Sequence, residues 1–260
     1  MGYGSIINET VGDIAVIRLN DEKSLNAMSP QMVDEMLDAL AQASQSKRAI
    51  VLTAVGRTFC SGANLGSLSY TFDDTYDAGV LLESHFNPLM IAIRDLPIPL
   101  VTAVNGHAVG VGGTVALAGD FIIASNQAYF LQAFRHVGVA PDAGTAYLLS
   151  RSVGRVRAME MMLLGEKIYA EQAFNWGLIN RVVAREEVEG SALDIARGLA
   201  AGPTKALGAI RRSCWHALDA DFPAQLAHDR VVQRELGKAA DHQEAIKAFF
   251  EKRAAVFTGR

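Results

Sequence analysis

A single carboxylate, Asp142, stands in the segment GVAPDAGTAY at 138–147, between a proline and the expected first turn of a helix. A carboxylate at such a position has two uses. It can cap the helix by accepting backbone N–H bonds, which lower its pKa. Alternatively, apolar neighbours such as Phe134 raise its pKa, so that it can accept a proton and return it. The segment taken alone favours the cap.

Two glycine-rich segments could present their backbone to a ligand. RTFCSGANLGSL at 57–68 and AVNGHAVGVGGTVALAGD at 103–120 each follow an expected strand and consist largely of small residues. Small residues let backbone N–H groups come close to a ligand oxygen. Tight turns and close packing explain the same glycines without a ligand, so both interpretations stay open. The second segment is not a dinucleotide fingerprint, because Val115 stands where the third glycine is required.

Alternating strands and helices are expected to position these segments. Ser29 and Pro30 start a helix with one apolar face between the first two of the expected strands. From about residue 143 the pattern changes to helices broken by glycines. We therefore expect a layered α/β core at 1–200 and a helical C-terminal region at 201–260. The expected strands are 14–19, 49–54, 100–106, 121–125 and 128–132.

Composition and charge exclude several classes of function. The chain has 260 residues, is 50% hydrophobic and carries a net charge of −4, so it lacks the basic surface that nucleic acids or anionic membranes require. The 24 residues between Asp95 and Asp120 carry no charge, and this stretch is long enough for a membrane span. Their prolines and five glycines instead favour a buried strand that is followed by a turn. Cys60 and Cys214 fit neither a disulfide framework nor a metal site. We expect a cytoplasmic protein without a targeting segment or a metal.

The two glycine-rich segments, together with PDAGTAYLL, LLGEKIYAEQAFNWGLINRVV and the terminal AFFEKRAAVFTGR, resemble the crotonase superfamily, the enoyl-CoA hydratase/isomerase family. The resemblance covers essentially the whole chain in the family's order. It implies an α/β spiral of ββα repeats, with a C-terminal helical region that serves trimerisation and contacts with coenzyme A (CoA). It also implies homotrimers or hexamers built from two trimers. The implied substrate is an acyl-CoA thioester, so CoA enters with the substrate and no separate cofactor is expected.

The resemblance also implies a catalytic site. The thioester oxygen is expected between the backbone N–H groups of Ala63 and Val111. Hydratases of the family activate water with two glutamates, and Thr114 and Phe134 stand at the matching positions. Neither side chain can do that work. Asp142 matches the acid of the isomerase branch, which moves a double bond from the 3-enoyl to the 2-enoyl position or rearranges an aryl-epoxy acyl-CoA.

The positions that match the CoA contacts of the family fall into an N-terminal and a C-terminal group. Lys252 and Arg253 of the second group suit the CoA phosphates, although a solvated helical face explains them equally well. The N-terminal group is Ser24, Leu25, Ala27, Ala63, Asn64 and Leu65, and the C-terminal group is Phe250, Lys252 and Arg253.

Three other functions remain as alternatives. The chain could be an enoyl-CoA hydratase, or a dehalogenase that uses Asp142 as its nucleophile, although Phe134 replaces the tryptophan associated with that activity. It could also be a non-catalytic scaffold that binds RNA, which the net charge of −4 argues against. His107, His136 and Asn87 lie near the expected site and receive no role.

Overall fold

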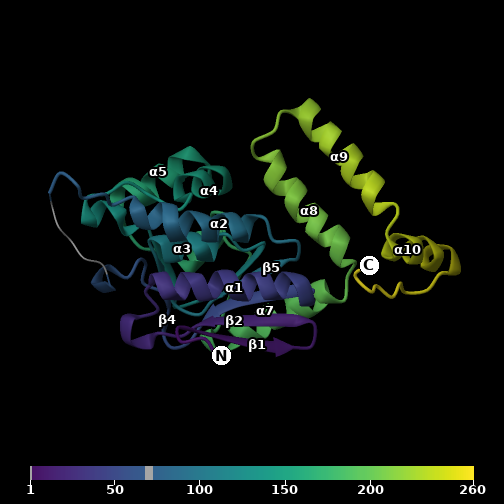
Figure 1. The fold of residues 1–260 in the computed structure, drawn as a ribbon, viewed down its shortest axis with the longest axis horizontal. Helices are drawn as coiled ribbons and strands as arrows, with labels where there is room; N and C mark the ends of the chain where they lie inside the picture. The colour runs from purple at the N-terminus through teal and green to yellow at the C-terminus, as the bar shows by residue number, and fades with distance from the viewer. Residues whose placement is uncertain (1, 68–72) are drawn as a thin grey trace.

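The computed structural model describes residues 2–67 and 73–260, and a six-stranded sheet forms its centre (Figure 1). The strand order is β1-β2-β3-β5-β7-β10, and every neighbouring pair is parallel except β1 and β2. The strands are β1 Ile6–Val11, β2 Ile14–Leu19, β3 Ala49–Ala54, β5 Leu100–Val104, β7 Phe121–Ser125 and β10 Arg181–Val183.

A second sheet has four strands in the order β4-β6-β8-β9. Three of them directly follow a strand of the large sheet, so that β3 leads to β4, β5 to β6 and β7 to β8. Helices follow each of these strand pairs, which confirms the predicted spiral of ββα repeats. The strands of the second sheet are β4 Thr58–Cys60, β6 His107–Val109, β8 Tyr129–Leu131 and β9 Ile168–Tyr169.

The strand predicted at 100–106 is wrong in its last part, because the chain turns before β6. Asn105 holds this turn by donating hydrogen bonds from Nδ2 to the C=O groups of Ala54 and Gly56. Gly106 lies so close to the preceding repeat that a Cβ would come within 1.9 Å of the Arg57 carbonyl oxygen. The turn therefore needs glycine at this position.

The hydrophobic core lies on both faces of the large sheet. Side chains along β2 and β3 alternate between the faces, as the two-residue period of a strand requires. Ile17 and Leu52 pack on the face covered by α1 (Pro30–Ser46), while Val16 and Val51 pack against α7 (Val188–Ala200). The predicted helix start is confirmed, because the Ser29 hydroxyl accepts a hydrogen bond from the N–H of Met32. Helices on both faces explain why every residue of β3 is buried.

The last three helices form an arm that extends from the core. Figure 1 shows α8 (Thr204–Ala217) and α9 (Phe222–Leu236) as a hairpin, with α10 (Ala240–Glu251) beyond it. This arm exposes large apolar side chains, among them Phe222 and Phe249. No helix in the described ranges combines the length and the apolar character needed to cross a membrane.

Arg211 attaches α8 to the core. Arg211 is only 5% exposed, and its guanidinium donates hydrogen bonds to the C=O groups of Ile93 in α2 (Asn87–Arg94) and of Leu96 just beyond this helix. Its Nε also pairs with the carboxylate of Asp120 at 2.8 Å. This buried ion pair fixes the helical arm relative to α2.

Replacing Arg211 with methionine should lower the free energy of unfolding by about 3–5 kcal/mol, because Asp120 and several carbonyl groups would lose a buried partner. Urea denaturation measures this loss. Arg212→Met is the matched control, since the neighbouring side chain is exposed. Equal and small losses in the two variants would mean that the ion pair contributes little to stability.

Candidate active site

The two glycine-rich loops leave the same edge of the small sheet. Strands β4 and β6 run parallel, and Cys60 pairs with Ala108. Ala63 and Val111 each lie three residues beyond this pair, so the chain brings both to one place. The loops also touch, because a Cβ on Gly110 would lie 3.9 Å from the Cα of Gly62.

The backbone N–H groups of Ala63 and Val111 are available to a ligand. Within residues 2–67 and 73–260, neither group has a hydrogen-bond acceptor. Their neighbours are bonded, since Asn64 N donates to Met28 O at 2.9 Å and Gly110 N donates to Leu131 O at 2.8 Å. Val111 opens α3 (Val111–Leu117), where first-turn N–H groups have no partner within the helix. Two such donors side by side can stabilise an oxyanion.

Gly112 allows the two loops to approach each other. A Cβ at this position would lie 2.4 Å from the Sγ of Cys60 and 3.0 Å from its carbonyl oxygen. Cys60 is fully buried, so neither atom can move away freely. Gly112→Ala should therefore displace the start of α3, and with it the N–H of Val111.

We expect Gly112→Ala to lower kcat by roughly 100- to 1,000-fold, the usual effect of losing one oxyanion donor. Steady-state kinetics with the acyl-CoA thioester expected from the sequence measures this effect. Gly190→Ala is the control, because a Cβ there meets no atom within 4 Å. A folded Gly112→Ala variant with the wild-type kcat would contradict the assigned role of this loop.

Asp142 does not cap the helix that follows it. The N-cap position of α4 (Thr145–Ser152) is Gly144, and no side chain caps this helix. The backbone carbonyl of Asp142, not its carboxylate, accepts the bonds from the N–H and the hydroxyl of Thr145, at 2.8 and 2.7 Å. The capping interpretation of Asp142 is therefore wrong.

The Asp142 carboxyl group has the environment of a proton acceptor. Its Oδ1 is buried and has no hydrogen-bond partner in the described part of the chain. Burial raises the pKa of Asp142 to about 6, and only a bond from its own backbone opposes this shift. A pKa near neutrality suits a general base, because the group can both accept and release a proton.

Two threonines hold Asp142 against the start of α3. The hydroxyl of Thr145, whose backbone N–H is bonded to Asp142, makes a short hydrogen bond with the hydroxyl of Thr114 in α3. Between Asp142 and Thr145, the chain passes through a left-handed conformation at Ala143, with φ of 49°. Thr114 is therefore engaged in structure, and Phe134 is buried at 7% exposure. Among the positions that the resemblance singled out for acid–base work, only Asp142 carries a carboxylate.

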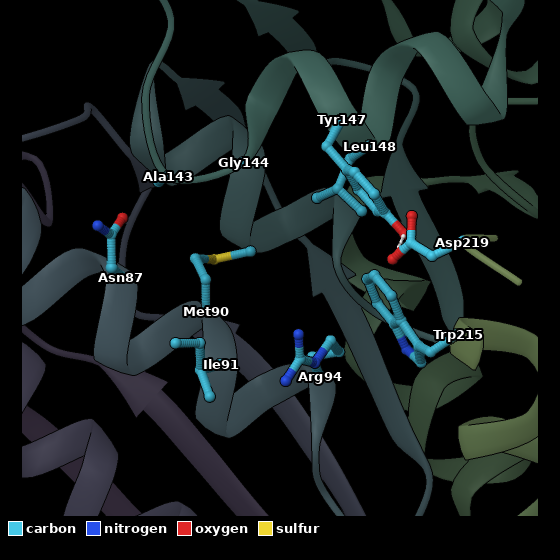
Figure 2. Close-up of a pocket in the computed structure, with 10 residues that line it drawn as sticks. All are labelled: Asn87, Met90, Ile91, Arg94, Ala143, Gly144, Tyr147, Leu148, Trp215 and Asp219. Atoms are coloured by element: carbon cyan, nitrogen blue, oxygen red, sulfur yellow. Dashed lines mark hydrogen bonds between the residues drawn. The ribbon is translucent and has the colours of Figure 1, made fainter.

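A cavity of about 330 Å³ adjoins the residues that follow Asp142 (Figure 2). Three helical segments form its walls, and the rings of Tyr147 and Trp215 lie nearly parallel to each other in one wall, with their centroids 6.5 Å apart. The Tyr147 hydroxyl donates to Asp219 at 3.0 Å. The lining residues are Asn87, Met90, Ile91 and Arg94 from α2, Ala143, Gly144, Tyr147 and Leu148 around the start of α4, and Trp215 and Asp219 from α8 and the turn after it.

The structure brings together the N-terminal group of predicted CoA residues. Ser61 donates from its backbone N–H to the carbonyl of Leu25 at 3.1 Å, and from its hydroxyl to the carbonyl of Ser24. Met28 and Ala63 form a bridge between the two segments. Ser24 to Ala27 and Ala63 to Leu65 therefore lie side by side.

The C-terminal group does not join them within one chain. Phe250, Lys252 and Arg253 lie at the end of α10, which Figure 1 shows at the outer end of the arm. The Arg253 guanidinium is paired with the carboxylates of Glu244 and Glu251, each at 2.6 Å. These residues can reach a CoA site only in a neighbouring copy or after a rearrangement of the arm.

The two histidines near the site make other contacts. His107 stacks on the ring of Tyr129 at 4.1 Å, and His136 is bonded through Nε2 to the carbonyl of Gly165. Asn87 was left without a role by its sequence context, and it lines the cavity in the structure. In the described ranges, no three His, Cys, Asp or Glu side chains group as ligands for a metal ion.

The fold and the site together define a class of protein: an α/β spiral with two glycine-rich loops whose backbone N–H groups at Ala63 and Val111 lack acceptors in the described ranges, and with a cavity that adjoins the residues after Asp142. Residues 9–260 match the family model described as enoyl-CoA hydratase/isomerase. The chain belongs to this family, which is the crotonase superfamily expected from the sequence.

Similar proteins carry the names of both activities. The chain is 42% identical to a probable enoyl-CoA hydratase of Rhodobacter capsulatus, over the full length of both chains. It is 38% identical to the 1,2-epoxyphenylacetyl-CoA isomerase of Escherichia coli, covering 98% of each chain. A crystal structure of a putative enoyl-CoA hydratase/isomerase from Mycobacterium abscessus has a TM-score of 0.92 and 34% identity, with 98% of this chain and 100% of that chain covered. The chain is thus an enzyme of the hydratase/isomerase family.

Proposed function

We propose that this protein is an acyl-CoA isomerase that converts 3-enoyl-CoA to 2-enoyl-CoA. The observation that carries the proposal is the Asp142 carboxyl group, which is half-buried, has a raised pKa and has an oxygen without a partner. No second carboxylate stands at the positions where the hydratases of this family place their glutamates, which are Thr114 and Phe134 here. One carboxylate is enough to move a proton between two carbons of the same substrate.

In the proposed mechanism, the thioester oxygen accepts hydrogen bonds from the N–H groups of Ala63 and Val111. The Asp142 carboxylate removes a proton from C2, and the electrons of the C–H bond delocalise into a dienolate whose charge rests on the thioester oxygen. The same carboxyl group then returns the proton to C4, which leaves the double bond between C2 and C3. The backbone N–H groups are fixed in place by the loops, so the stabilisation requires little reorganisation.

An aryl-epoxy acyl-CoA is the second candidate substrate. The cavity wall contains the nearly parallel rings of Tyr147 and Trp215, which suit an aromatic acyl group. The E. coli relative is named as an isomerase of such a compound. The oxyanion site and Asp142 would serve this rearrangement as well.

The proposal predicts a pH dependence with a defined sign. Because the active form of Asp142 is the carboxylate, kcat/KM should rise about tenfold per pH unit below pH 6 and level off above it. Rates of double-bond migration between pH 4.5 and 8 measure this profile. A rate that is flat across this range would mean that another group takes the proton.

We also propose a homotrimer, or a hexamer of two trimers, in the cytoplasm. The arm exposes Phe222, Phe249 and Phe250 at about three quarters of their surface, and apolar patches of this kind mark protein interfaces. A neighbouring copy could also supply the Lys252 and Arg253 contacts that a single chain does not assemble. Cys60 and Cys214 are free thiols, as a reducing compartment allows. Sedimentation velocity tests the assembly, and a monomer would contradict it.

A further inference from the structure

A second cavity, of about 480 Å³, adjoins the cavity beside Asp142. The two cavities have three lining residues in common, which are Arg94, Trp215 and Asp219. The other residues around the second cavity come mainly from α8, α9 and the turn between these helices. The three shared residues therefore separate the two cavities, and we call them the partition.

The partition closes the cavity beside Asp142 at the end remote from the proposed base. Figure 2 shows Asn87 and Ala143 at one end of this cavity and the three residues of the partition at the other. Ala143 directly follows Asp142 in the chain. The space between the two ends has an apolar lining of Met90, Ile91 and Leu148. An acyl chain that extends from Asp142 along this lining meets the partition last.

Trp215 supplies the apolar bulk of the partition. Its side chain is half-buried, whereas Arg94 and Asp219 are exposed residues that carry their charges to the surface. The indole ring lies nearly parallel to the ring of Tyr147, with the two centroids 6.5 Å apart. Trp215 is therefore the side chain that a hydrocarbon chain would touch at the end of the cavity.

Contacts from α4 hold the partition in place. The carboxylate of Asp219 accepts a hydrogen bond from the Tyr147 hydroxyl at 3.0 Å and pairs with Nη2 of Arg151 at 3.1 Å. The Arg151 guanidinium also lies over the Tyr147 ring, 3.7 Å from its centroid, and donates from Nε to the carbonyl of Leu218 at 3.4 Å. Exposed ion pairs contribute little to stability, but together these contacts fix the turn after α8 against α4.

The length of the cavity can be compared with that of an acyl chain. Asn87 and Arg94 stand at opposite ends of α2, seven residues apart, which is about 10 Å along the helix axis. This distance is longer than an extended six-carbon acyl chain and shorter than an extended ten-carbon chain. A six-carbon chain can therefore end before the partition, and a ten-carbon chain must reach it.

From this arrangement we infer that Trp215 sets the upper limit on the length of the acyl group, an inference that rests on the proposed acyl-CoA substrate. Trp215 is a specificity-determining residue and takes no part in the proton transfer. Removal of the indole should join the two cavities. A longer chain could then continue past the partition toward Ala220 and Ala224, which line the second cavity.

The test compares two saturated acyl-CoA thioesters, which bind but do not isomerise. Isothermal titration of the wild-type protein should give a Kd for decanoyl-CoA that is no lower than the Kd for hexanoyl-CoA. In Trp215→Ala, the Kd for decanoyl-CoA should fall roughly tenfold or more, because each methylene that leaves water strengthens binding roughly fourfold. The Kd for hexanoyl-CoA should stay near its wild-type value.

Two further variants accompany Trp215→Ala. Trp215→Leu keeps an apolar contact on α8 and should change the ratio of the two Kd values in the same direction, so that the test survives if the alanine variant does not fold. Cys214→Ala is the matched control, because it removes the exposed neighbouring side chain, which lines neither cavity. The kcat/KM ratio of 3-decenoyl-CoA to 3-hexenoyl-CoA should rise in both Trp215 variants and stay unchanged in Cys214→Ala.

Two results would overturn the inference. The first is a ratio of Kd values that is the same in folded Trp215→Ala or Trp215→Leu as in Cys214→Ala. The second is an equal change of both Kd values, which would mean that Trp215 acts through the fold of the arm and not through the length of the cavity. Titration needs no turnover, so a failure of the isomerase proposal would be recognised separately in the kinetics.

Discussion

Asp142→Asn should lower the isomerase kcat by roughly two to four powers of ten, which is the usual contribution of a general base. The amide keeps the size of the side chain but cannot accept a proton from C2. The thermal midpoint should not fall and the Kd for CoA should not change, because the carboxylate caps no helix and its Oδ1 accepts no hydrogen bond in the described part of the chain. Steady-state kinetics, thermal unfolding and titration of CoA measure the three quantities.

The control for this variant is Asp194→Asn, which removes an exposed carboxylate on α7. It should retain the wild-type kcat. If Asp142→Asn lowered the thermal midpoint and left turnover per folded enzyme unchanged, Asp142 would be a structural residue and the mechanism would be wrong.

The enzyme should hydrate crotonyl-CoA at no more than a trace rate. Thr114 and Phe134 stand where hydratases of the family have glutamates, and each missing acid or base costs roughly two to four powers of ten. The Thr114 hydroxyl is also held by Thr145 and the carbonyl of Gly110. Loss of the enoyl absorbance and detection of 3-hydroxybutyryl-CoA by mass spectrometry measure the reaction.

A 3-enoyl-CoA of similar length serves as the positive control on the same enzyme preparation. Double-bond migration with that substrate, together with no hydration of crotonyl-CoA, is the expected pair of results. Rapid hydration at neutral pH would mean that a residue other than Thr114 and Phe134 activates water.

Local signals in the sequence were sufficient for much of the fold. The β-branched runs at 14–19, 49–54 and 121–125 are strands with these bounds, and Ser29 caps the first helix. The short strands β1 and β10 were not predicted. Ile6–Val11 alternates weakly and lies at the sheet edge, and Arg181–Val183 has only three residues, so neither carries a clear pattern.

The sequence was sufficient to predict the two backbone N–H groups of the site, because each lies in a glycine-rich loop that follows a strand. The parallel pairing of β4 and β6 brings Ala63 and Val111 together, and the glycines around them mark both loops. No pattern in the sequence predicts the cavity beside Asp142, because its lining residues Asn87, Tyr147 and Trp215 come from three helical segments far apart in the chain. Their contact depends on the docking of α8, which Arg211 fixes through tertiary contacts.

The question of whether Asp142 acts as a cap or as a base could not be answered from its neighbours in the sequence. A cap requires the carboxylate to reach the first N–H groups of α4, and the left-handed residues Ala143 and Gly144 give the chain a different path. Their conformation depends on the hydrogen bonds that Thr145 makes to Asp142 and Thr114.

Transfer of an isotopic label tests the central claim most directly. A 3-enoyl-CoA with deuterium at C2 is converted in a single turnover in ordinary water, and the 2-enoyl product is analysed by NMR for deuterium at C4. If the half-buried Asp142 carboxyl group carries the proton from C2 to C4, a measurable fraction of the product should hold deuterium at C4. A product whose new hydrogen at C4 comes entirely from water would contradict a single-carboxylate shuttle.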